Sequence, residues 1–371
     1  MNEIYLGLMS GTSLDAVDAV AVCFDNTGSI QLLGTHSLAL PTLLRNDILS
    51  LTQPANNEIE RLGAIDIQIG LLFAQCANQL LAKLSLATTN IKAIGSHGQT
   101  IRHRPYLQTP FTLQIGDPNV IAEQTGITVV ADFRRRDVAA GGHGAPLVPA
   151  FHEAILRSSN TNRVVLNLGG MANITVLAAD YSQMVYGYDT GPANVLMDAW
   201  CQRTLQQAFD NNGEWAASGN INQSLLTEML AHPFFAKMPP KSTGREDFHL
   251  DWLLAFLRDD YADVLAEDIQ ATLLALTAQS VADAVIKTGF TTGELWLCGG
   301  GAYNRALQQK LAELLPHFSL HNTDDIGIAP TWIEASAFAW LARQTLQGLS
   351  GNLPAVTGAT GKRILGGIFQ A

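Results

Sequence analysis

The sequence predicts an α/β protein made of two domains. Apolar and β-branched strands alternate with long helical patterns along the chain, which is typical of α/β folds. A length of 371 residues is too great for one ordinary core and suits two domains. The arrangement of strand, glycine turn and strand that opens the chain returns near its middle, so we expect the two halves to be built alike.

Composition indicates a well-packed protein with small-molecule partners. Hydrophobic residues make up 47% and charged residues 15% of the chain, which is enough to form a sizeable core. The 22 Lys and Arg against 33 Asp and Glu give a formal net charge of −11. This balance argues against nucleic acid or an anionic membrane as the main partner, whereas a small anionic ligand needs only a local site.

The cysteines and the N-terminus indicate the compartment. Cys23, Cys76, Cys201 and Cys298 lie far apart without zinc-ligand spacing, so we expect buried free thiols. The chain begins directly with a strand, and no apolar run approaches about 18 residues. We therefore expect a cytoplasmic protein with no membrane segment.

In the first half, strands are expected at residues 4–9, 93–96 and 127–131, and a helix at 146–156. A longer helix is expected over 58–84 because apolar residues recur there at helical spacing. Its apolar face comprises Ile59, Leu62, Ile65, Ile69, Leu72, Phe73 and Cys76. Glycines 141, 142 and 144 are a candidate hinge.

In the second half, strands at 164–168 and 172–176 flank the turn Gly169-Gly170. A helix over 267–288 precedes a strand at 295–298, and another helix opens near Tyr303. An amphipathic helix over 332–347 is expected to carry the chain back toward the first half.

The turn after the first strand has the composition of a phosphate site. Gly11, Thr12 and Ser13 offer backbone N–H groups and hydroxyls to phosphate oxygens, and Asp15 can approach a bound magnesium ion through water. The alternative is an ordinary hairpin loop, because small polar residues favour turns for steric reasons alone.

Two glycine turns are candidates for nucleotide binding. Gly299, Gly300 and Gly301 lie between a strand and a helix, where a nucleotide can approach the backbone closely. Gly169 and Gly170 form a similar turn. Either turn could instead be a tight connection that needs a positive φ.

Asp189 is the best candidate for chemistry. It is expected at a strand end before Thr190-Gly191-Pro192, with a helix starting near Asn194, so its carboxylate should project into a cleft as a general base must. The alternative is an aspartate that caps the helix or stabilises the turn.

Polar residues also close two other predicted strands. His97 and Gln99 follow the strand at 93–96, and Arg134 follows the strand at 127–131. Strand ends of α/β sheets line clefts, and these groups suit a polyhydroxylated ligand that bears a carboxylate. Any single arginine here could instead be ordinary surface charge.

Six motifs in order along the chain give a resemblance to a known family. They are Met9-Ser10-Gly11-Thr12-Ser13-Leu14-Asp15, Ser96-His97-Gly98-Gln99-Thr100, Ala131-Asp132-Phe133-Arg134, Asn167-Leu168-Gly169-Gly170-Met171-Ala172-Asn173, Asp189-Thr190-Gly191-Pro192 and Cys298-Gly299-Gly300-Gly301. The sequence resembles the anhydro-N-acetylmuramic acid kinases of the actin-like ATPase superfamily. The resemblance implies two RNase H-like lobes with an interlobe cleft that binds ATP. One lobe would comprise residues 1–140, completed by about 333–371, and the other residues 141–332.

The resemblance also implies roles for particular residues. Asp189 would be the catalytic base and contact the sugar. The other sugar-binding residues would be His97, Gln99, Arg134 and Glu334. The residues implied to bind ATP are Gly11, Thr12, Ser13, Leu14, Asp15, Ala16, Val17, Asp18, Gly169, Gly170, Gly299, Gly300 and Gly301, with Asp15 meeting ATP-bound Mg²⁺ through water. The sequence departs from the usual family pattern at Ala16, Ala193 and His143.

The implied reaction is ATP-dependent hydrolytic opening of 1,6-anhydro-N-acetylmuramic acid with phosphorylation of O6. Opening the bridge at the anomeric carbon releases O6, the oxygen that attacks the γ-phosphate, so one carboxylate can start both events. The product is N-acetylmuramic acid 6-phosphate, and the family implies a homodimer. Alternatives are a kinase for another hexose or amino sugar, and an ATP-driven chaperone or filament protein.

Overall fold

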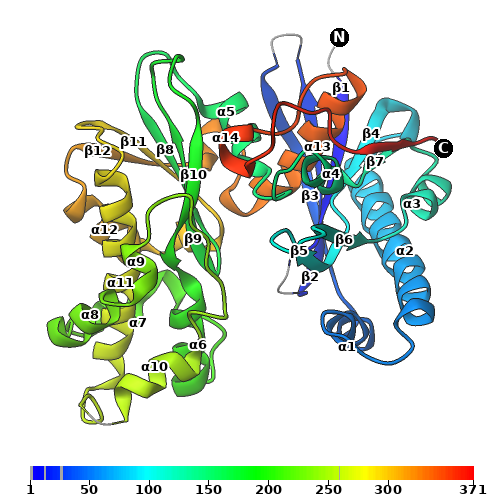
Figure 1. Cartoon of the computed structure of the whole chain (residues 1–371). Helices are drawn as coiled ribbons and strands as arrows, with labels where there is room; N and C mark the ends of the chain where they lie inside the picture. Colours follow the sequence, from blue (N-terminus) through cyan, green and yellow to red (C-terminus); the bar gives the residue numbers. More distant parts are fainter. Residues whose placement is uncertain (1–2, 12–13, 26–27, 259) are drawn as a thin grey trace. The chain divides into compact units, whose positions relative to one another are not determined.

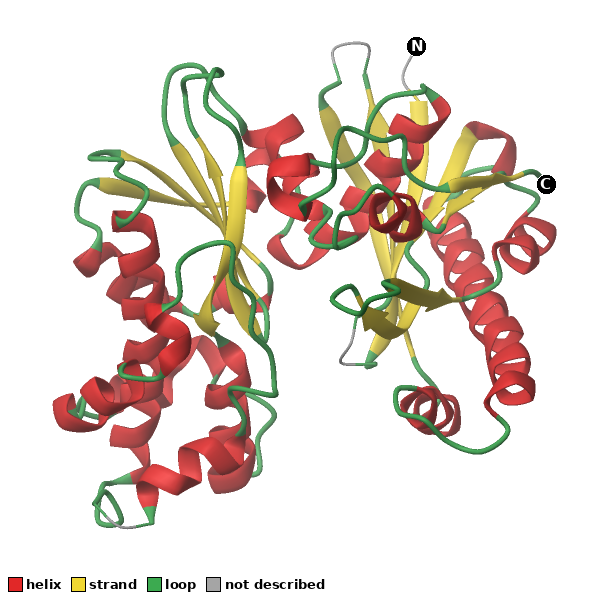
Figure 2. Cartoon of the chain, in the orientation of Figure 1, coloured by secondary structure: helices red, strands yellow, loops and turns green. Residues whose placement is uncertain are grey.

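The computed structural model describes residues 3–11, 14–25, 28–258 and 260–371 (Figure 1). Thr12 and Ser13, two of the expected phosphate-binding residues, therefore lie outside the described residues. The chain divides into two compact units, coloured by secondary structure in Figure 2. Unit 1 comprises Met1–Ile155 and Trp332–Ala371, and unit 2 comprises Leu156–Thr331.

A six-stranded sheet in the order β13-β7-β4-β1-β2-β3 forms the centre of unit 1. Its strands are β1 (Glu3–Met9), β2 (Ala16–Phe24), β3 (Ile30–Ala39), β4 (Ile91–Ser96), β7 (Val129–Ala131) and β13 (Gly367–Phe369). The first three strands are antiparallel, and β4 and β7 continue the sheet parallel to β1. A separate hairpin pairs β5 (Gln99–Arg104) with β6 (Phe111–Ile115).

Helix α2 (Glu58–Leu84) has the predicted bounds and packs on β2 and β3. Ile65, Ile69 and Phe73 are buried as expected, but Ile59 is wrong as a core residue because it lies in the first turn and is 84% exposed. The other helices of unit 1 are α1 (Thr42–Leu51), α3 (Pro118–Thr125), α4 (Phe133–Ala139), α5 (Val148–Leu156), α13 (Ile333–Leu346) and α14 (Pro354–Thr357).

Helix α13 approaches the sheet of unit 1 very closely. It packs on β1, β2 and β4, and Gly7 and Gly95 face each other across the β1–β4 pair beneath it. A Cβ at Gly7 would overlap the carbonyl oxygen of Ala335, and one at Gly95 would overlap that of Phe338. These two glycines allow the backbone of α13 to lie against the strands, which fixes the helix start that carries Glu334.

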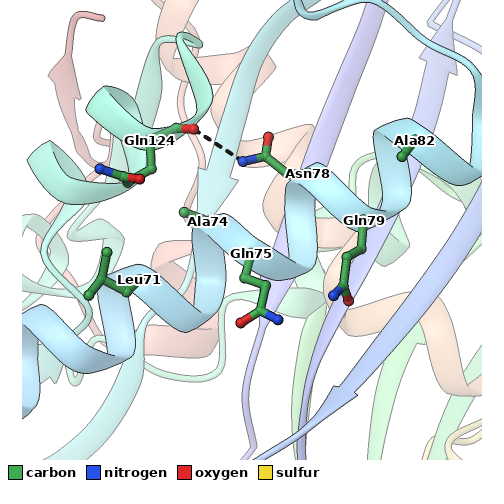
Figure 3. Close-up of a pocket in the computed structure, with 7 residues that line it drawn as sticks. All are labelled: Leu71, Ala74, Gln75, Asn78, Gln79, Ala82 and Gln124. Atoms are coloured by element: carbon green, nitrogen blue, oxygen red, sulfur yellow. Dashed lines mark hydrogen bonds between the residues drawn. The ribbon is translucent and has the colours of Figure 1, made fainter.

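The outer face of α2 carries a shallow pocket of about 410 Å³ (Figure 3). Leu71, Gln75 and Gln79 lie on successive turns of the helix, and the side-chain amide of Asn78 donates a 3.1 Å hydrogen bond to the carbonyl oxygen of Gln124. The side chains that line this pocket carry no formal charge.

Unit 2 is built on a five-stranded sheet in the order β10-β9-β8-β11-β12. Its strands are β8 (Arg163–Leu168), β9 (Met171–Leu177), β10 (Tyr186–Pro192), β11 (Gly293–Cys298) and β12 (Phe318–Asn322). As in unit 1, three antiparallel strands are followed by parallel ones, and the first strand is central. The expected similarity of the halves is therefore confirmed, and each unit has the strand order of an RNase H-like lobe.

Helix α11 (Ala266–Ile286) is the core helix of unit 2. Within the described chain it alone is long and apolar enough to cross a membrane, but 83% of its apolar window is buried inside the protein. The other helices are α6 (Asn194–Leu205), α7 (Glu214–Ser218), α8 (Gln223–Leu230), α9 (Pro233–Ala236), α10 (Leu250–Leu257) and α12 (Arg305–Leu314). The short 3₁₀ helices are η1 (Thr88–Asn90), η2 (Asn211–Gly213), η3 (Gly300–Tyr303), η4 (Thr323–Ile326) and η5 (Pro330–Trp332).

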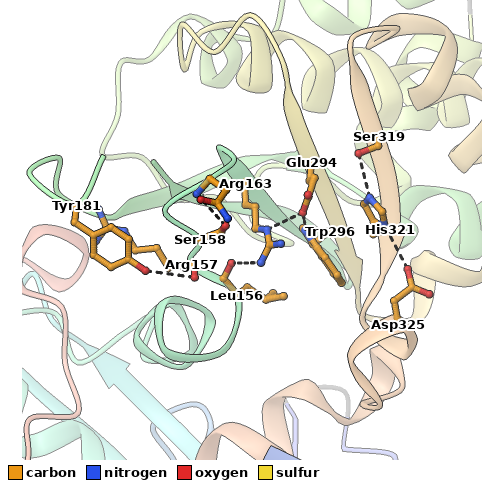
Figure 4. Close-up of polar contacts among 11 residues, drawn as sticks. Leu156, Arg157, Ser158, Arg163, Tyr181, Glu294, Trp296, Ser319, His321 and Asp325 are labelled. Atoms are coloured by element: carbon orange, nitrogen blue, oxygen red, sulfur yellow. Dashed lines mark hydrogen bonds and ion pairs between the residues drawn. The ribbon is translucent and has the colours of Figure 1, made fainter. Parts of the chain in front are cut away.

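An ion pair joins the amino ends of β8 and β11 (Figure 4). Nε of Arg163 lies 2.6 Å from Oε2 of Glu294, and the indole N–H of Trp296 donates a 2.8 Å hydrogen bond to the same oxygen. The ring of Trp296 stacks on His321 of β12. The ion pair joins β8 to β11 at the end opposite their glycine turns, and the ring stack joins β11 to β12.

Candidate active site

In unit 1, the predicted phosphate turn joins β1 to β2 in a hairpin in which Met9 pairs with Asp18. Oγ of Ser10 is buried and donates a 3.0 Å hydrogen bond to the carbonyl oxygen of Ala16. The backbone N–H of Leu14 donates a hydrogen bond to the carbonyl oxygen of Gly11. Leu14 adopts a φ of 58°, in the left-handed region. These hydrogen bonds join the described residues on the two sides of the turn.

The two aspartates of this hairpin face different surroundings. Asp15 is exposed, and its nearest cation is Arg45, at 4.0 Å. Val17 and Ala19 pack into the core beside α2, so Asp18 between them points to the opposite face of the sheet, where α13 lies. Burial raises the pKa of Asp18, and its charge in turn raises the pKa of Glu334.

His97 and Arg134 meet at the ends of β4 and β7. Nε of Arg134 donates a 3.0 Å hydrogen bond to Nε2 of His97. Because arginine can only donate, Nε2 is an acceptor and the proton of the neutral ring is on Nδ1. Burial, and then the positive charge of Arg134, lower the pKa of His97 well below its usual value of 6.5, so the ring is neutral.

Other buried polar groups lie beside this pair. Oε1 of Gln99 is buried and has no hydrogen-bond partner among the described residues. The buried His97 ring, in contrast, lies close enough to the backbone of Ser10 and Gly98 for hydrogen bonds that partly offset the fall in its pKa. Glu334, at the start of α13, is close enough for Arg134 to lower its pKa, although desolvation has the larger, opposite effect and raises it overall. A buried polar atom without a partner is costly, so the Gln99 oxygen is suited to a polar ligand.

In unit 2, the two predicted glycine turns lie side by side because β8 and β11 are parallel neighbours. Gly301 packs so closely that an added Cβ would lie 2.8 Å from Cβ of Leu168. The backbone N–H groups of Ala193 and Val195, at the start of α6, donate to the carbonyl oxygen of Gly170. Gly300, in contrast, has open space beside it.

That open space belongs to a cavity of about 440 Å³ in unit 2. Gly300, Asn194 and Tyr303 line it, together with Asp198, whose pKa is raised to about 6 by burial and by the charge of Asp210. The cavity is of the size that small-molecule ligands use, and its walls mix aromatic and polar groups. Its position beside the glycine turns fits a nucleoside.

Asp189 lies within β10, not at the strand end, because a bulge after it lets the strand continue to Pro192. Its neighbour on β9 is Asn173. The backbone N–H of Asp189 donates a 3.1 Å hydrogen bond to the carbonyl oxygen of Lys241, and Oδ2 accepts a 3.0 Å hydrogen bond from the backbone N–H of Thr243. The loop therefore holds both the backbone of Asp189 and one oxygen of its carboxylate.

The environment of Asp189 suits a general base. Burial is the largest effect and raises its pKa from 3.8 to about 6. The Thr243 hydrogen bond and the ammonium group of Lys241 lower the pKa, whereas the carboxylate of Glu246 raises it. The 241–246 segment was not predicted to act here, because it lies more than fifty residues from Asp189 and carries no recognisable motif.

The structure thus groups the candidate residues in two sets. Unit 1 brings together the Ser10 turn, His97, Gln99, Arg134 and Glu334, and unit 2 brings the glycine turns beside the cavity and orients Asp189. Among the described residues, no cluster of three His, Cys, Asp or Glu side chains could hold a metal ion by itself. All four cysteines are buried thiols, as expected.

Comparison with protein families gives one match over nearly the whole chain. The family model described as anhydro-N-acetylmuramic acid kinase matches residues 3–371. The anhydro-N-acetylmuramic acid kinase of a Shewanella species is 52% identical over 372 residues and covers 100% of both chains. The corresponding protein of Acinetobacter baylyi is 51% identical over 378 residues, covering 99% of each.

Comparison with solved structures finds more distant likenesses. The activator of a 2-hydroxyisocaproyl-CoA dehydratase from Clostridium difficile with bound ADPNP aligns with 94% of this chain and 98% of its own, at 13% identity and a TM-score of 0.47.

Proposed function

This chain belongs to the anhydro-N-acetylmuramic acid kinase family, and we propose that its two groups of site residues divide the work of that reaction. The enzyme is a phosphotransferase with an alcohol group as acceptor. It opens 1,6-anhydro-N-acetylmuramic acid by hydrolysis and phosphorylates O6 with ATP, giving N-acetylmuramic acid 6-phosphate and ADP in the recycling of cell-wall sugars.

Asp189 acts as the general base. Its carboxylate takes a proton from the water that attacks C1, and the bond from C1 to the bridging oxygen breaks as the bond to water forms. The released O6 then attacks the γ-phosphate, and ADP leaves. A pKa near 6 supports this role because the carboxylate is ionised at neutral pH and is a stronger base than an ordinary aspartate.

The sugar is held by groups of unit 1. His97 offers an N–H at Nδ1, Gln99 offers its carbonyl oxygen, and Arg134 supplies a cation for an anionic group of the sugar. Glu334 can accept a hydrogen bond from a sugar hydroxyl. The observation that carries this assignment is the buried carbonyl oxygen of Gln99, which has no partner among the described residues, beside the hydrogen-bonded His97–Arg134 pair.

The nucleotide is held by backbone turns. Gly300 opens onto the cavity that would take the adenosine, and Gly169 and Gly170 have room for phosphate oxygens. Gly11 and the Ser10 turn would meet the terminal phosphates.

Magnesium bound to the phosphates would neutralise charge on the transferring group. Of the two hairpin aspartates, we infer that Asp18 rather than Asp15 approaches that ion through water, since Asp18 points to the face of α13, which carries Glu334.

We also propose a cytoplasmic homodimer. The reaction consumes ATP, which the cytoplasm supplies. The outer face of α2 has a half-exposed Leu71 between uncharged glutamines, in a chain of net charge −11, so two copies could meet there without like-charge repulsion. Sedimentation of wild type and Leu71→Arg would test this, and an unchanged dimer in the variant would exclude this face.

Mass analysis of the product in ¹⁸O-labelled water tests the reaction. The enzyme is incubated with ATP, Mg²⁺ and the anhydro sugar, and the product should gain one water and one phosphoryl group, with the label at C1. A phosphorylated product without the label would instead indicate a kinase that acts on a pre-existing hydroxyl.

A further inference from the structure

Asp137, on α4, is a fully buried carboxylate held by two distant segments. Oδ2 accepts a 2.8 Å hydrogen bond from the backbone N–H of Gly144. Oδ1 accepts hydrogen bonds from the hydroxyl of Thr357, at 2.8 Å, and from the side-chain amide of Asn352, at 2.7 Å. A buried carboxylate with this many donors joins the elements that supply them.

The carboxylate fixes the glycine cluster that follows α4. An added Cβ at Gly142 would overlap Oδ2 of Asp137, so the loop is wrapped directly around the acid. The backbone N–H of His143 also donates a 2.8 Å hydrogen bond to the carbonyl oxygen of Thr357. The loop suggested as a hinge by its glycines is thus anchored inside unit 1 to the 352–357 segment.

This loop in turn holds Arg134. Nη1 of Arg134 donates a 2.9 Å hydrogen bond to the carbonyl oxygen of Gly144, while its Nε donates to His97. The charge of Asp137 also favours the protonated guanidinium, although burial outweighs it and lowers the pKa of Arg134 to about 10. The guanidinium is thus held on one side by His97 and on the other by a loop that Asp137 fixes.

We propose that Asp137 is a positioning residue for the sugar site. It does not contact the sugar; it fixes the carbonyl group of Gly144 and thereby the direction in which Arg134 and His97 present their donors. The inference rests on the proposed function in taking Arg134 and His97 as sugar-binding residues. Removing the carboxylate should weaken sugar binding while leaving nucleotide binding in unit 2 intact.

The test measures KM for the sugar and for ATP separately. In Asp137→Asn an amide nitrogen replaces Oδ2 and cannot accept the hydrogen bond from the Gly144 N–H. We therefore expect sugar KM to rise roughly 10- to 100-fold, while ATP KM changes by less than about twofold. Asp132→Asn is the matched control, because Asp132 pairs with exposed Arg135 next to the same helix. Circular dichroism and melting temperature show that the kinetics are measured on folded enzyme.

A second pair of variants applies if Asp137→Asn does not fold. Thr357→Val removes one donor to the carboxylate and should raise sugar KM. Thr357→Ser keeps the hydroxyl, so its sugar KM should stay near the wild-type value. A lowered melting temperature with unchanged sugar KM in Thr357→Val would overturn the proposal, because the network would then be structural only.

Arg134→Ala separates this inference from the proposed function. If Asp137 acts through Arg134, adding Asp137→Asn to Arg134→Ala should raise sugar KM little further. Full additivity would overturn the inference. If Arg134→Ala itself leaves sugar KM unchanged, the assignment of Arg134 to the sugar fails. A raised KM in Arg134→Ala beside an unchanged KM in Asp137→Asn would overturn the positioning role alone.

Discussion

The backbone N–H of Thr243 donates a 3.0 Å hydrogen bond to Oδ2 of Asp189, which joins a loop to the proposed catalytic base. A second hydrogen bond runs from the backbone N–H of Asp189 to the carbonyl oxygen of Lys241. One carboxylate oxygen is therefore fixed by the loop, and this arrangement defines the direction in which the other oxygen can take a proton. The loop also brings two opposite charges, those of Lys241 and Glu246, near the carboxylate.

Asp189→Asn should abolish most turnover and keep nucleotide affinity. The amide cannot accept a proton from water, so we expect kcat to fall roughly 10²–10⁴-fold, while the cavity beside Gly300 is untouched. Steady-state kinetics and titration calorimetry with a non-hydrolysable ATP analogue would measure both. Asp180→Asn, at an exposed turn of unit 2, is the control. Near-wild-type turnover in Asp189→Asn would remove this residue from its role.

The pH profile should show an acidic limb with a midpoint near the raised pKa of Asp189, about 6. The base must be ionised, so kcat/KM rises as pH increases through that value and falls below it. Glu246 raises this pKa and Lys241 lowers it, so the limb should move to lower pH in Glu246→Gln and to higher pH in Lys241→Met.

Each of these shifts should be on the order of half a pH unit, because Glu246 is exposed and Lys241 is only half-buried, so water screens both charges. The control is Glu60→Gln, at an exposed position of α2 in unit 1. Shifts of the same sign in the two loop variants would contradict the assignment of the limb to Asp189.

The sequence predicted the strands, the main helices and the glycine turns because their signals are local. The 58–84 helix was predicted to the residue, and the repeated strand order follows from the repeated strand and turn pattern. Contacts made at long sequence separation carried no such signal. The Thr243 hydrogen bond to Asp189, and the close approach of α13 allowed by Gly7 and Gly95, depend on how distant segments fold together.

Asp18 and Asp15 illustrate the same limit. Both occur in the phosphate motif, and spacing alone favoured Asp15 as the group that reaches magnesium through water. Strand alternation in the folded hairpin points Asp18 toward the face of α13, whereas Asp15 is exposed beside Arg45.

Asp18→Asn should therefore raise the magnesium concentration that gives half-maximal activity roughly tenfold or more, as loss of an outer-shell ligand does. Asp15→Asn should change it much less. Magnesium titrations of both variants at saturating ATP and sugar would compare them, and the reverse order would restore Asp15 to the role.

Gly300→Val should block the nucleoside cavity without harming the fold. Gly300 has no atom near the position of an added Cβ, so the new side chain should project into open space. Overpacking of a bound nucleoside costs about 1–3 kcal/mol, hence roughly tenfold or more in ATP affinity. Gly301→Ala should instead lower the melting temperature, because its Cβ would meet Leu168 at 2.8 Å. Unchanged ATP affinity in Gly300→Val would place the nucleoside elsewhere.

Glu294→Gln should destabilise unit 2 at neutral pH by about 1–3 kcal/mol, because it breaks a charged hydrogen-bond pair with Arg163 and weakens that with Trp296. Desolvation alone would raise the pKa of Glu294, but these two partners hold it below its usual 4.5. The stabilisation is therefore complete above pH 4.5 and is lost as pH falls through the lower, folded-state value.

Guanidinium unfolding followed by fluorescence should show the difference in unfolding free energy between wild type and variant closing in that acidic range. Glu313→Gln, which breaks the more exposed pair with Lys310, should have little effect. A gap that stays constant with pH would mean that the Glu294 charge contributes nothing and that the variant acts through packing.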